Sequence, residues 1–254
     1  VLGGGMLASG MYVLAARPGM GKTTLAMNIA DRVAKRTGPV LFISLEMDVE
    51  QLEAKRAARE SGVPGNKLLM QRLTDAEYTK VAQAADVLNE LPLYVNQKAS
   101  ATVAEMETLA RKVPGLALIV IDYLQLMTTG QRTENRVQEI SSITRNLKIM
   151  AKEMNVPIIA LSQLSRAVEK QGNNSSHRPQ LSDLRDSGSI EQDADCVLFL
   201  YRDSYYASQN PDGAEVDADT AECIVAKNRH GETSTVPLGW DGAHTRFMDV
   251  DFKR

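Results

Sequence analysis

The residues best suited to bind an anion lie near the start of the chain, at positions 16–23 (ARPGMGKT). This segment matches the phosphate-binding pattern G-x-x-x-x-G-K-[ST], except that Ala16 stands in place of the leading glycine. Gly19 and Gly21 let successive backbone N–H groups turn toward an anion, and the dipole of a following helix adds to that attraction. The segment therefore predicts a site for the phosphates of a nucleotide.

Two side chains of this loop have distinct expected roles. Lys22 would reach the β- and γ-phosphates, and the Thr23 hydroxyl would ligate Mg²⁺. A GKT triplet alone can be a chance turn, but here an apolar strand-like run precedes the triplet and a helical pattern follows it. The predicted nucleotide-binding residues are Ala16, Arg17, Pro18, Gly19, Met20, Gly21, Lys22, Thr23 and Thr24.

A carboxylate ends the apolar run at positions 116–122 (LALIVID). In enzymes with a phosphate loop, an aspartate at such a strand end holds Mg²⁺ through the water shell of the ion. Many buried strands end in Asp, so the assignment of Asp122 as a metal-binding residue depends on the phosphate loop upstream.

Two more polar side chains follow strand-like runs: Glu46 after positions 40–45, and Gln163 after positions 156–161. The carboxyl ends of strands in a parallel sheet face the ligand crevice. A carboxylate there could polarise the water that attacks a γ-phosphate, and an amide could sense that phosphate. On the residues alone, Glu46 could also be a helix N-cap or a surface acid, and Gln163 could be an ordinary polar residue at a strand end.

The elements that must position these residues alternate along the chain. Capping boxes at positions 74–77 and 102–105, and an apolar stripe over positions 135–154, predict helices. Short apolar runs typical of buried parallel strands occupy positions 12–16, 40–45, 93–95, 116–121, 156–161 and 196–201. The expected fold is α/β, a mostly parallel twisted sheet flanked by helices. Near the C-terminus, apolar runs on either side of positions 227–232 predict an appended β-hairpin.

Composition limits the class of protein. The 254 residues are 43% hydrophobic and 24% charged, which is typical of a globular chain and excludes wholesale disorder. No apolar run approaches the roughly 18–20 residues that span a bilayer, so no membrane span is expected. Cys196 and Cys223 have no CxxC spacing, which argues against a disulfide framework or a zinc site and favours a reducing compartment. The start at Val1 indicates a fragment or a processed piece.

Charge is unevenly distributed along a chain whose formal net charge is −3. Positions 132–185 hold nine Arg or Lys against five acids, whereas positions 186–222 hold one Arg against ten acids. The first segment could present a local basic surface to nucleic acid, or both segments could be solvated faces.

Several motifs together resemble the hexameric replicative DNA helicases of the bacterial DnaB type. The resemblance covers nearly the whole chain in the order of the family, and corresponds to its C-terminal RecA-like motor domain. It implies that residues 1–254 form a single RecA-like ATPase domain, without the N-terminal helical domain and linker of the family. The motifs are GKTT, SLEM, IDYLQLM (121–127), ALSQLSRAVE (160–169), PQLSDLRDSGSIEQDAD (179–195), LFLYRD (198–203) and AKNRHG (226–231).

The resemblance implies roles for the strand-end residues and for a basic pair. Glu46 matches the catalytic base, Asp122 the Walker B aspartate and Gln163 the γ-phosphate sensor. Lys227 and Arg229 match the two cations that one subunit delivers to the nucleotide of its neighbour.

The resemblance also implies a contact with single-stranded DNA. Positions 183–188 match the loop that tracks the strand in the central channel, and Arg185, Asp186 and Gly188 fall on positions that contact its backbone. Two departures stand out: Ala16 replaces a glycine, and Asp186 stands where Glu is expected.

The function implied is an ATP-dependent hexameric motor that translocates on single-stranded DNA and unwinds duplex at the replication fork. It implies ATP or another NTP with Mg²⁺, a cytoplasmic homohexamer, and contacts with primase and a helicase loader through the full-length protein. Two alternatives share the core. A recombinase or circadian-type ATPase predicts filament contacts or a tandem repeat, and a non-hydrolysing loader module has no need of a base at Glu46.

Overall fold

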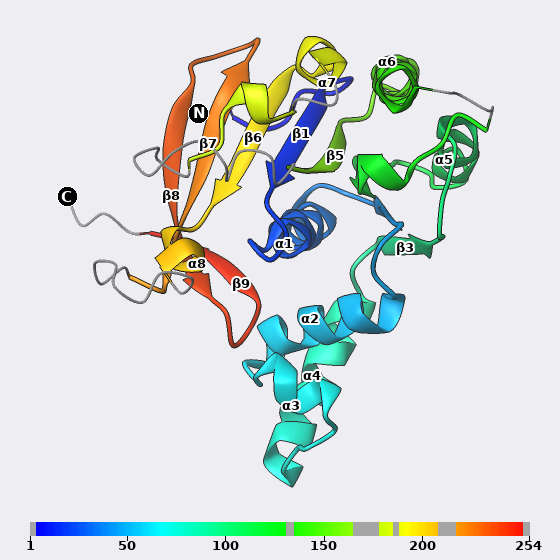
Figure 1. Cartoon of the computed structure of the whole chain (residues 1–254). Helices are drawn as coiled ribbons and strands as arrows, with labels where there is room; N and C mark the ends of the chain where they lie inside the picture. The colour runs from blue at the N-terminus through cyan, green and yellow to red at the C-terminus, as the bar shows by residue number, and fades with distance from the viewer. Residues whose placement is uncertain (1–3, 131–134, 165–177, 185–187, 208–216, 251–254) are drawn as a thin grey trace.

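The computed structural model describes residues 4–130, 135–164, 178–184, 188–207 and 217–250 (Figure 1). Within these residues a nine-stranded sheet has the order β3-β2-β4-β5-β1-β6-β7-β8-β9. The strands are β1 (Met11–Ala16), β2 (Val40–Ser44), β3 (Leu93–Gln97), β4 (Leu118–Asp122), β5 (Ile158–Gln163), β6 (Cys196–Tyr201), β7 (Thr220–Asn228), β8 (Ser234–Asp241) and β9 (Arg246–Asp249). The pairings from β3 to β6 are parallel, and those from β6 to β9 are antiparallel.

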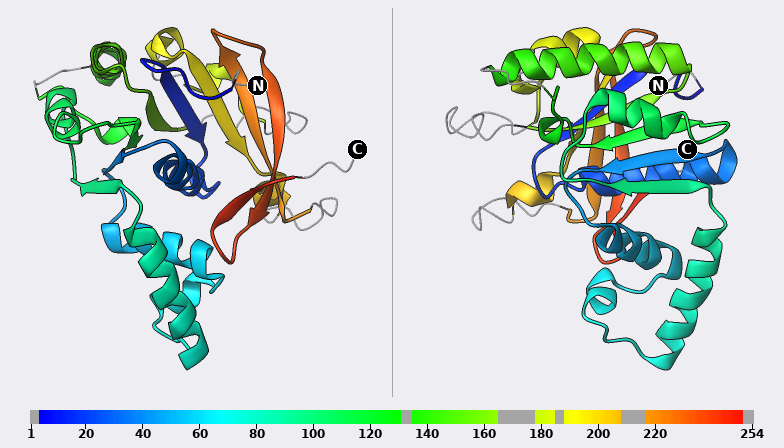
Figure 2. Two further views of the ribbon diagram at one scale, coloured as in Figure 1. Left: turned by 180° about the vertical axis from the view of Figure 1, so that it is seen from behind. Right: turned by 90° about the vertical axis from the view of Figure 1, so that its right-hand side faces the viewer.

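Helices cover both faces of the parallel part of the sheet. They are α1 (Lys22–Arg36), α2 (Val49–Ser61), α3 (Gly65–Leu69), α4 (Asp75–Asn89), α5 (Val103–Ala110), α6 (Arg136–Met154), α7 (Gly188–Asp193) and α8 (Asp203–Ala207), with short 3-10 turns η1 (Leu124–Leu126) and η3 (Leu181–Leu184). Figure 2 shows α1 on one side of the sheet and α5 with α6 on the other. No helix of the described residues is long and apolar enough to cross a membrane.

Alternation along the buried strands divides the apolar core into two layers. Side chains of a strand point in turn to opposite faces of the sheet. In β1, Met11, Val13 and Ala15 belong to the layer that includes α6, and Tyr12, Leu14 and Ala16 to the layer that includes α1. Both faces of β1, β2, β4, β5 and β6 are therefore buried, as the continuous apolar runs predicted, whereas the edge strand β3 is half-buried or exposed.

The predicted helix starts are confirmed in atomic detail. Thr74 and Thr102 each accept a hydrogen bond from the backbone N–H three residues on, and Glu77 and Glu105 each accept one in turn from the backbone N–H of the cap. Asn135 caps α6 by accepting from the Val137 N–H at 3.0 Å.

The C-terminal hairpin is larger than the sequence predicted. Strands β7 and β8 form the expected hairpin, but β9 adds a third antiparallel strand with Trp240 opposite Phe247. The hairpin prediction is confirmed, and β9 was not predicted because it has only four residues and precedes a charged segment. The sheet curls here so that β9 reaches α1, and the Phe247 N–H donates to Asn28 Oδ1 at 3.0 Å.

Helices α2, α3 and α4 form an arm that projects from the sheet (Figure 1). The apolar pattern did not single out α2, because its buried residues are only Leu52, Arg56 and Ala58. Most of this helix is polar, so contacts other than a wide apolar face must fix its position.

The capping box of α5 makes the first prediction. Thr102→Ala should lower the free energy of unfolding by about 1 kcal/mol, because a backbone N–H at the helix start loses its acceptor. Urea unfolding of the chain measures this change. Thr108→Ala, an exposed substitution in the same helix, is the matched control and should be near neutral, because Ala is a good helix former. Equal losses in the two variants would contradict the capping role.

Candidate nucleotide-binding site

The predicted phosphate loop connects β1 to α1 in the conformation that its glycines allow. Gly19 and Gly21 have φ angles of 79° and 96°, and Gly21 is the N-cap of α1. A Cβ atom on Gly21 would lie 3.0 Å from a ring carbon of Phe247, and one on Gly19 would lie 3.1 Å from a ring carbon of Tyr205. Both the left-handed backbone and the lack of space therefore require glycine.

Ala16 departs from the general pattern without cost to the loop. It is the last residue of β1, lies opposite Gln163 in the parallel register, and accepts from the Leu164 N–H at 3.0 Å. Extended backbone of this kind suits any L-residue, so a glycine is not needed.

Asp122 meets the phosphate loop from the end of β4. Its side chain is fully buried, and its Oδ2 accepts from the Thr23 hydroxyl at 2.7 Å. Its Oδ1 has no hydrogen-bond partner and lies 3.7 Å from Lys22 Nζ. A hydroxyl beside a carboxylate oxygen is a donor set that Mg²⁺ prefers, and Oδ1 remains for a metal-bound water. The residues present therefore fit a Mg²⁺ ion.

Lys22 is buried, with 8% of its surface exposed. Burial lowers the pKa of its amino group, while Asp122 and Glu46 act in the opposite direction. The amino group also lies 4.3 Å from the centre of the Tyr123 ring. Asp122, at 3.7 Å, is a distant charge partner for this buried cation. An anionic phosphate in the cavity would provide a further one.

The phosphate loop opens into a cavity of about 300 Å³. Glu46 from the end of β2 and Gln163 from the end of β5 line the same cavity, so the structure brings these predicted residues together. Asp48 is the N-cap of α2, so Glu46 does not have that role. Gln125 holds the backbone of Gln163 by accepting from its N–H and donating to its carbonyl, each at 3.2 Å.

Two cavity residues were not predicted as site residues. Lys55 of α2 lines the cavity, and burial lowers the pKa of its amino group while Asp122 raises it. Trp240 of β8 also lines the cavity, with the Arg202 guanidinium 4.4 Å from its ring centre. No short motif marks either residue, because each reaches the loop only through the tertiary fold.

Lys227 and Arg229 lie at the opposite end of the strands from the phosphate loop. The antiparallel register places Asn228 opposite Cys196, at the start of β6, whereas the phosphate loop follows the other end of β1. Lys227 donates to the Glu191 and Ala194 carbonyls at the end of α7. Arg229 donates to the Gln192 carbonyl and lies 3.7 Å from an oxygen of Asp195. The structure does not bring this pair to the phosphate loop of its own chain.

The predicted DNA contacts are described only in part. Arg185 and Asp186 lie outside the described residues, and Gly188 is the exposed first residue of α7. Within the basic segment, Arg136 pairs with Glu139, Lys148 with Asp195, and Arg178 with Glu222. Part of the positive charge of this segment is thus neutralised internally.

Comparisons with known proteins agree with this geometry. Residues 2–249 match the family of the DnaB-like helicase C terminal domain. Replicative DNA helicase DnaB of Leifsonia xyli is 41% identical over 94% of this chain, and that of Geobacillus stearothermophilus is 41% identical over 97%. These matches cover 52% and 54% of the two relatives, so the chain spans about half their length.

Two solved structures share the fold at 33% sequence identity, each with a TM-score of 0.88. A DnaB-like replicative helicase, described together with its interactions with primase, matches 96% of this chain and 58% of its own. A separately solved ATPase domain matches 97% of this chain and 87% of its own. With a family model that covers nearly every residue, these matches show that the chain belongs to the DnaB-like helicase C-terminal domain family.

Proposed function

We propose that residues 1–254 form one RecA-like motor domain that hydrolyses ATP to move a replicative helicase along single-stranded DNA. The observation that carries the proposal is the hydrogen bond from Thr23 to the buried Asp122 beside Lys22, at a glycine loop whose cavity is also lined by Glu46. The names of the helicase relatives and of the solved ATPase domain support it. Because the chain spans about half of those relatives, unwinding of duplex DNA is proposed for a longer protein that contains it.

The residues divide the work of hydrolysis. The loop N–H groups and Lys22 would bind the phosphates, and Thr23 with Asp122 would hold a Mg²⁺ ion. When bound, that ion neutralises negative charge on the phosphates. Glu46 would accept a proton from the attacking water, while Lys55 and Gln163 would contact the γ-phosphate. A base at the cavity favours hydrolysis over a nucleotide-gated loader module.

The position of Lys227 and Arg229 supports a ring as the working form. They lie at the end of the strands away from the phosphate loop of their own chain, so they would act on the nucleotide of a neighbouring subunit in a homohexamer. Single-stranded DNA would contact Arg185, Asp186 and Gly188. A primase partner is proposed from a solved relative described with primase, and a loader would bind through the full-length protein.

Glu46→Gln tests the role of the proposed base. The variant should bind ATP normally but hydrolyse it at least about 100-fold more slowly, because the amide cannot accept the proton. A DNA-stimulated ATPase assay and the affinity for a fluorescent ATP analogue measure the two effects. Glu50→Gln, another exposed acid just beyond, is the control and should hydrolyse like the wild type. Full turnover in Glu46→Gln would exclude Glu46 as the base.

Arg229→Ala tests whether Arg229 acts on the nucleotide of a neighbouring subunit. The variant should bind nucleotide but lose about 10³-fold or more in turnover, as for other arginine fingers. Mixing it with Lys22→Ala subunits should restore activity, because some interfaces then pair an intact loop with an intact Arg229. If mixed rings form, as shown by native mass spectrometry, and turnover does not recover, Arg229 does not act on a neighbour.

A further inference from the structure

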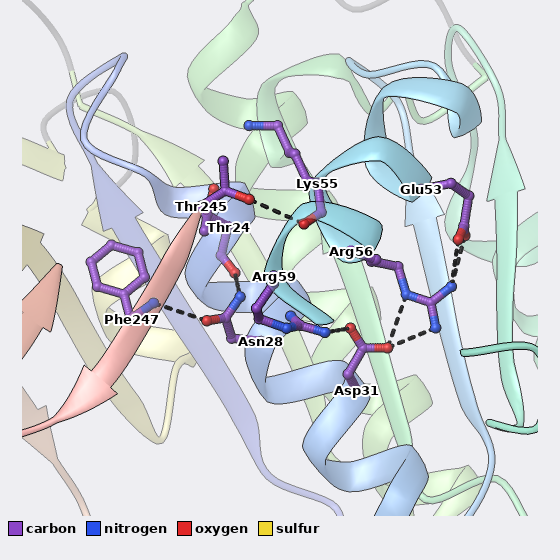
Figure 3. Close-up of polar contacts among 9 residues, drawn as sticks. All are labelled: Thr24, Asn28, Asp31, Glu53, Lys55, Arg56, Arg59, Thr245 and Phe247. Carbon is purple, nitrogen blue, oxygen red and sulfur yellow. Dashed lines mark hydrogen bonds and ion pairs between the residues drawn. The ribbon is translucent and has the colours of Figure 1, made fainter. Parts of the chain in front are cut away.

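A buried carboxylate on the phosphate-loop helix joins that helix to α2. Asp31 lies two turns beyond Thr24 on α1, and its side chain is 8% exposed (Figure 3). Its Oδ1 accepts from Arg56 Nε at 3.0 Å and lies 2.8 Å from Arg56 Nη2. Its Oδ2 accepts from Arg59 Nη2. One acid of α1 therefore holds two guanidinium groups of α2.

Glu53 completes the charge balance of this cluster. It accepts from Arg56 Nη1 with both carboxylate oxygens, at 2.8 and 2.7 Å. Two carboxylates thus face two guanidinium groups, and the Arg56 side chain is only 5% exposed. Removing Asp31 would leave a buried cation incompletely paired, which is unfavourable in a site with little water.

Further hydrogen bonds close a three-way junction between α1, α2 and the segment that runs from the β8–β9 turn into β9 (Figure 3). The Thr245 hydroxyl donates to the Lys55 carbonyl at 3.1 Å. Asn28 accepts from the Phe247 N–H at 3.0 Å and donates to the Thr24 carbonyl at 2.8 Å. Each of the three elements is therefore bonded to the other two, and Thr24, in the first turn of α1, lines the phosphate cavity.

The junction fixes the position of Lys55 on α2. Its backbone carbonyl is held by Thr245, and the next residue, Arg56, is held by Asp31. Figure 3 shows its amino group pointing away from the Asp31 cluster. The side chain instead lines the phosphate cavity. Among the buried residues of α2, only Leu52 and Ala58 are apolar, so few apolar contacts could replace the junction.

We propose that Asp31 is a positioning residue for the phosphate site. It holds α2 at the place relative to α1 where Lys55 meets the phosphates that the loop binds. This inference rests on the function proposed above, in which Lys55 contacts the γ-phosphate. Asp31 itself touches no nucleotide and acts through Arg56, Arg59 and the backbone of α2.

A double-mutant cycle tests this role in the full chain, with ATP and Mg²⁺ as the probe. Lys55→Met should lower kcat/KM by about tenfold or more, and Asp31→Asn should lower it by about three- to tenfold. If Asp31 acts through Lys55, the double variant should match Lys55→Met within about twofold. Glu60→Gln, an exposed acid of the same helix as Lys55, is the matched control and should match the wild type. Multiplicative losses in the double variant would overturn the proposal.

Thermal unfolding shows whether Asp31→Asn folds, and a second variant tests the proposal if it does not. Arg59→Gln removes one guanidinium group and leaves the Asp31–Arg56 pair in place. Its smaller loss of kcat/KM should also disappear in the Lys55→Met background, and persistence of the loss there would contradict the positioning role.

The same measurements separate the failure of this inference from that of the proposed function. Wild-type turnover no higher than that of Lys22→Ala would refute ATP hydrolysis itself, and with it this inference. Undiminished turnover in Lys55→Met would refute the contact of Lys55 with phosphate. Independent losses from Asp31→Asn and Lys55→Met would refute only the role of Asp31.

Discussion

The arrangement of the site depends on one buried carboxylate. Asp122 has no exposed surface, so its charge needs partners inside the protein, and Thr23 and Lys22 provide them. Those partners begin α1, which reaches Asp122 only because β5 alone separates β1 from β4 in the sheet. The register then aligns the neighbouring strand ends, with Ser44 opposite Asp122 and Ala16 opposite Gln163. Glu46 and Gln163 consequently face the same cavity as the loop.

The sequence predicted features that depend on near neighbours along the chain. Residues close together in the sequence determine these features: the glycines of the loop, the capping boxes at Thr74 and Thr102, and the polar residues at strand ends. The contacts of Lys55 and β9 join distant segments: the bond from Phe247 to Asn28 spans 219 residues. No periodicity or spacing could reveal such a contact. The burial of Lys22 likewise depends on the tertiary fold, in which its amino group lies near the ring of Tyr123.

The antiparallel strands explain why Lys227 and Arg229 are separated from Lys22 at the phosphate loop of the same chain. Because β7 is antiparallel to β6, the last residues of β7 lie at the end of the sheet where the parallel strands begin. Lys227 and Arg229 donate there to carbonyl groups at the end of α7, and Arg229 also lies 3.7 Å from an oxygen of Asp195. A phosphate carries the negative charge that a carbonyl lacks, so the nucleotide of a neighbouring subunit would compete with these carbonyls in the proposed ring. A head-to-tail ring repeats such an interface around its circumference.

Helix α2 is held to α1 by ion pairs rather than by a wide apolar face. A buried ion pair adds little stability compared with apolar packing, because removing both charges from water is unfavourable. Its geometry, however, is restrictive, since a guanidinium group meets a carboxylate in few orientations. Arg56 and Arg59 on Asp31 therefore define the position and the rotation of α2 more narrowly than Leu52 and Ala58 could alone. The contact of Lys55 with phosphate that we propose would depend on this restriction of α2 more than on added stability.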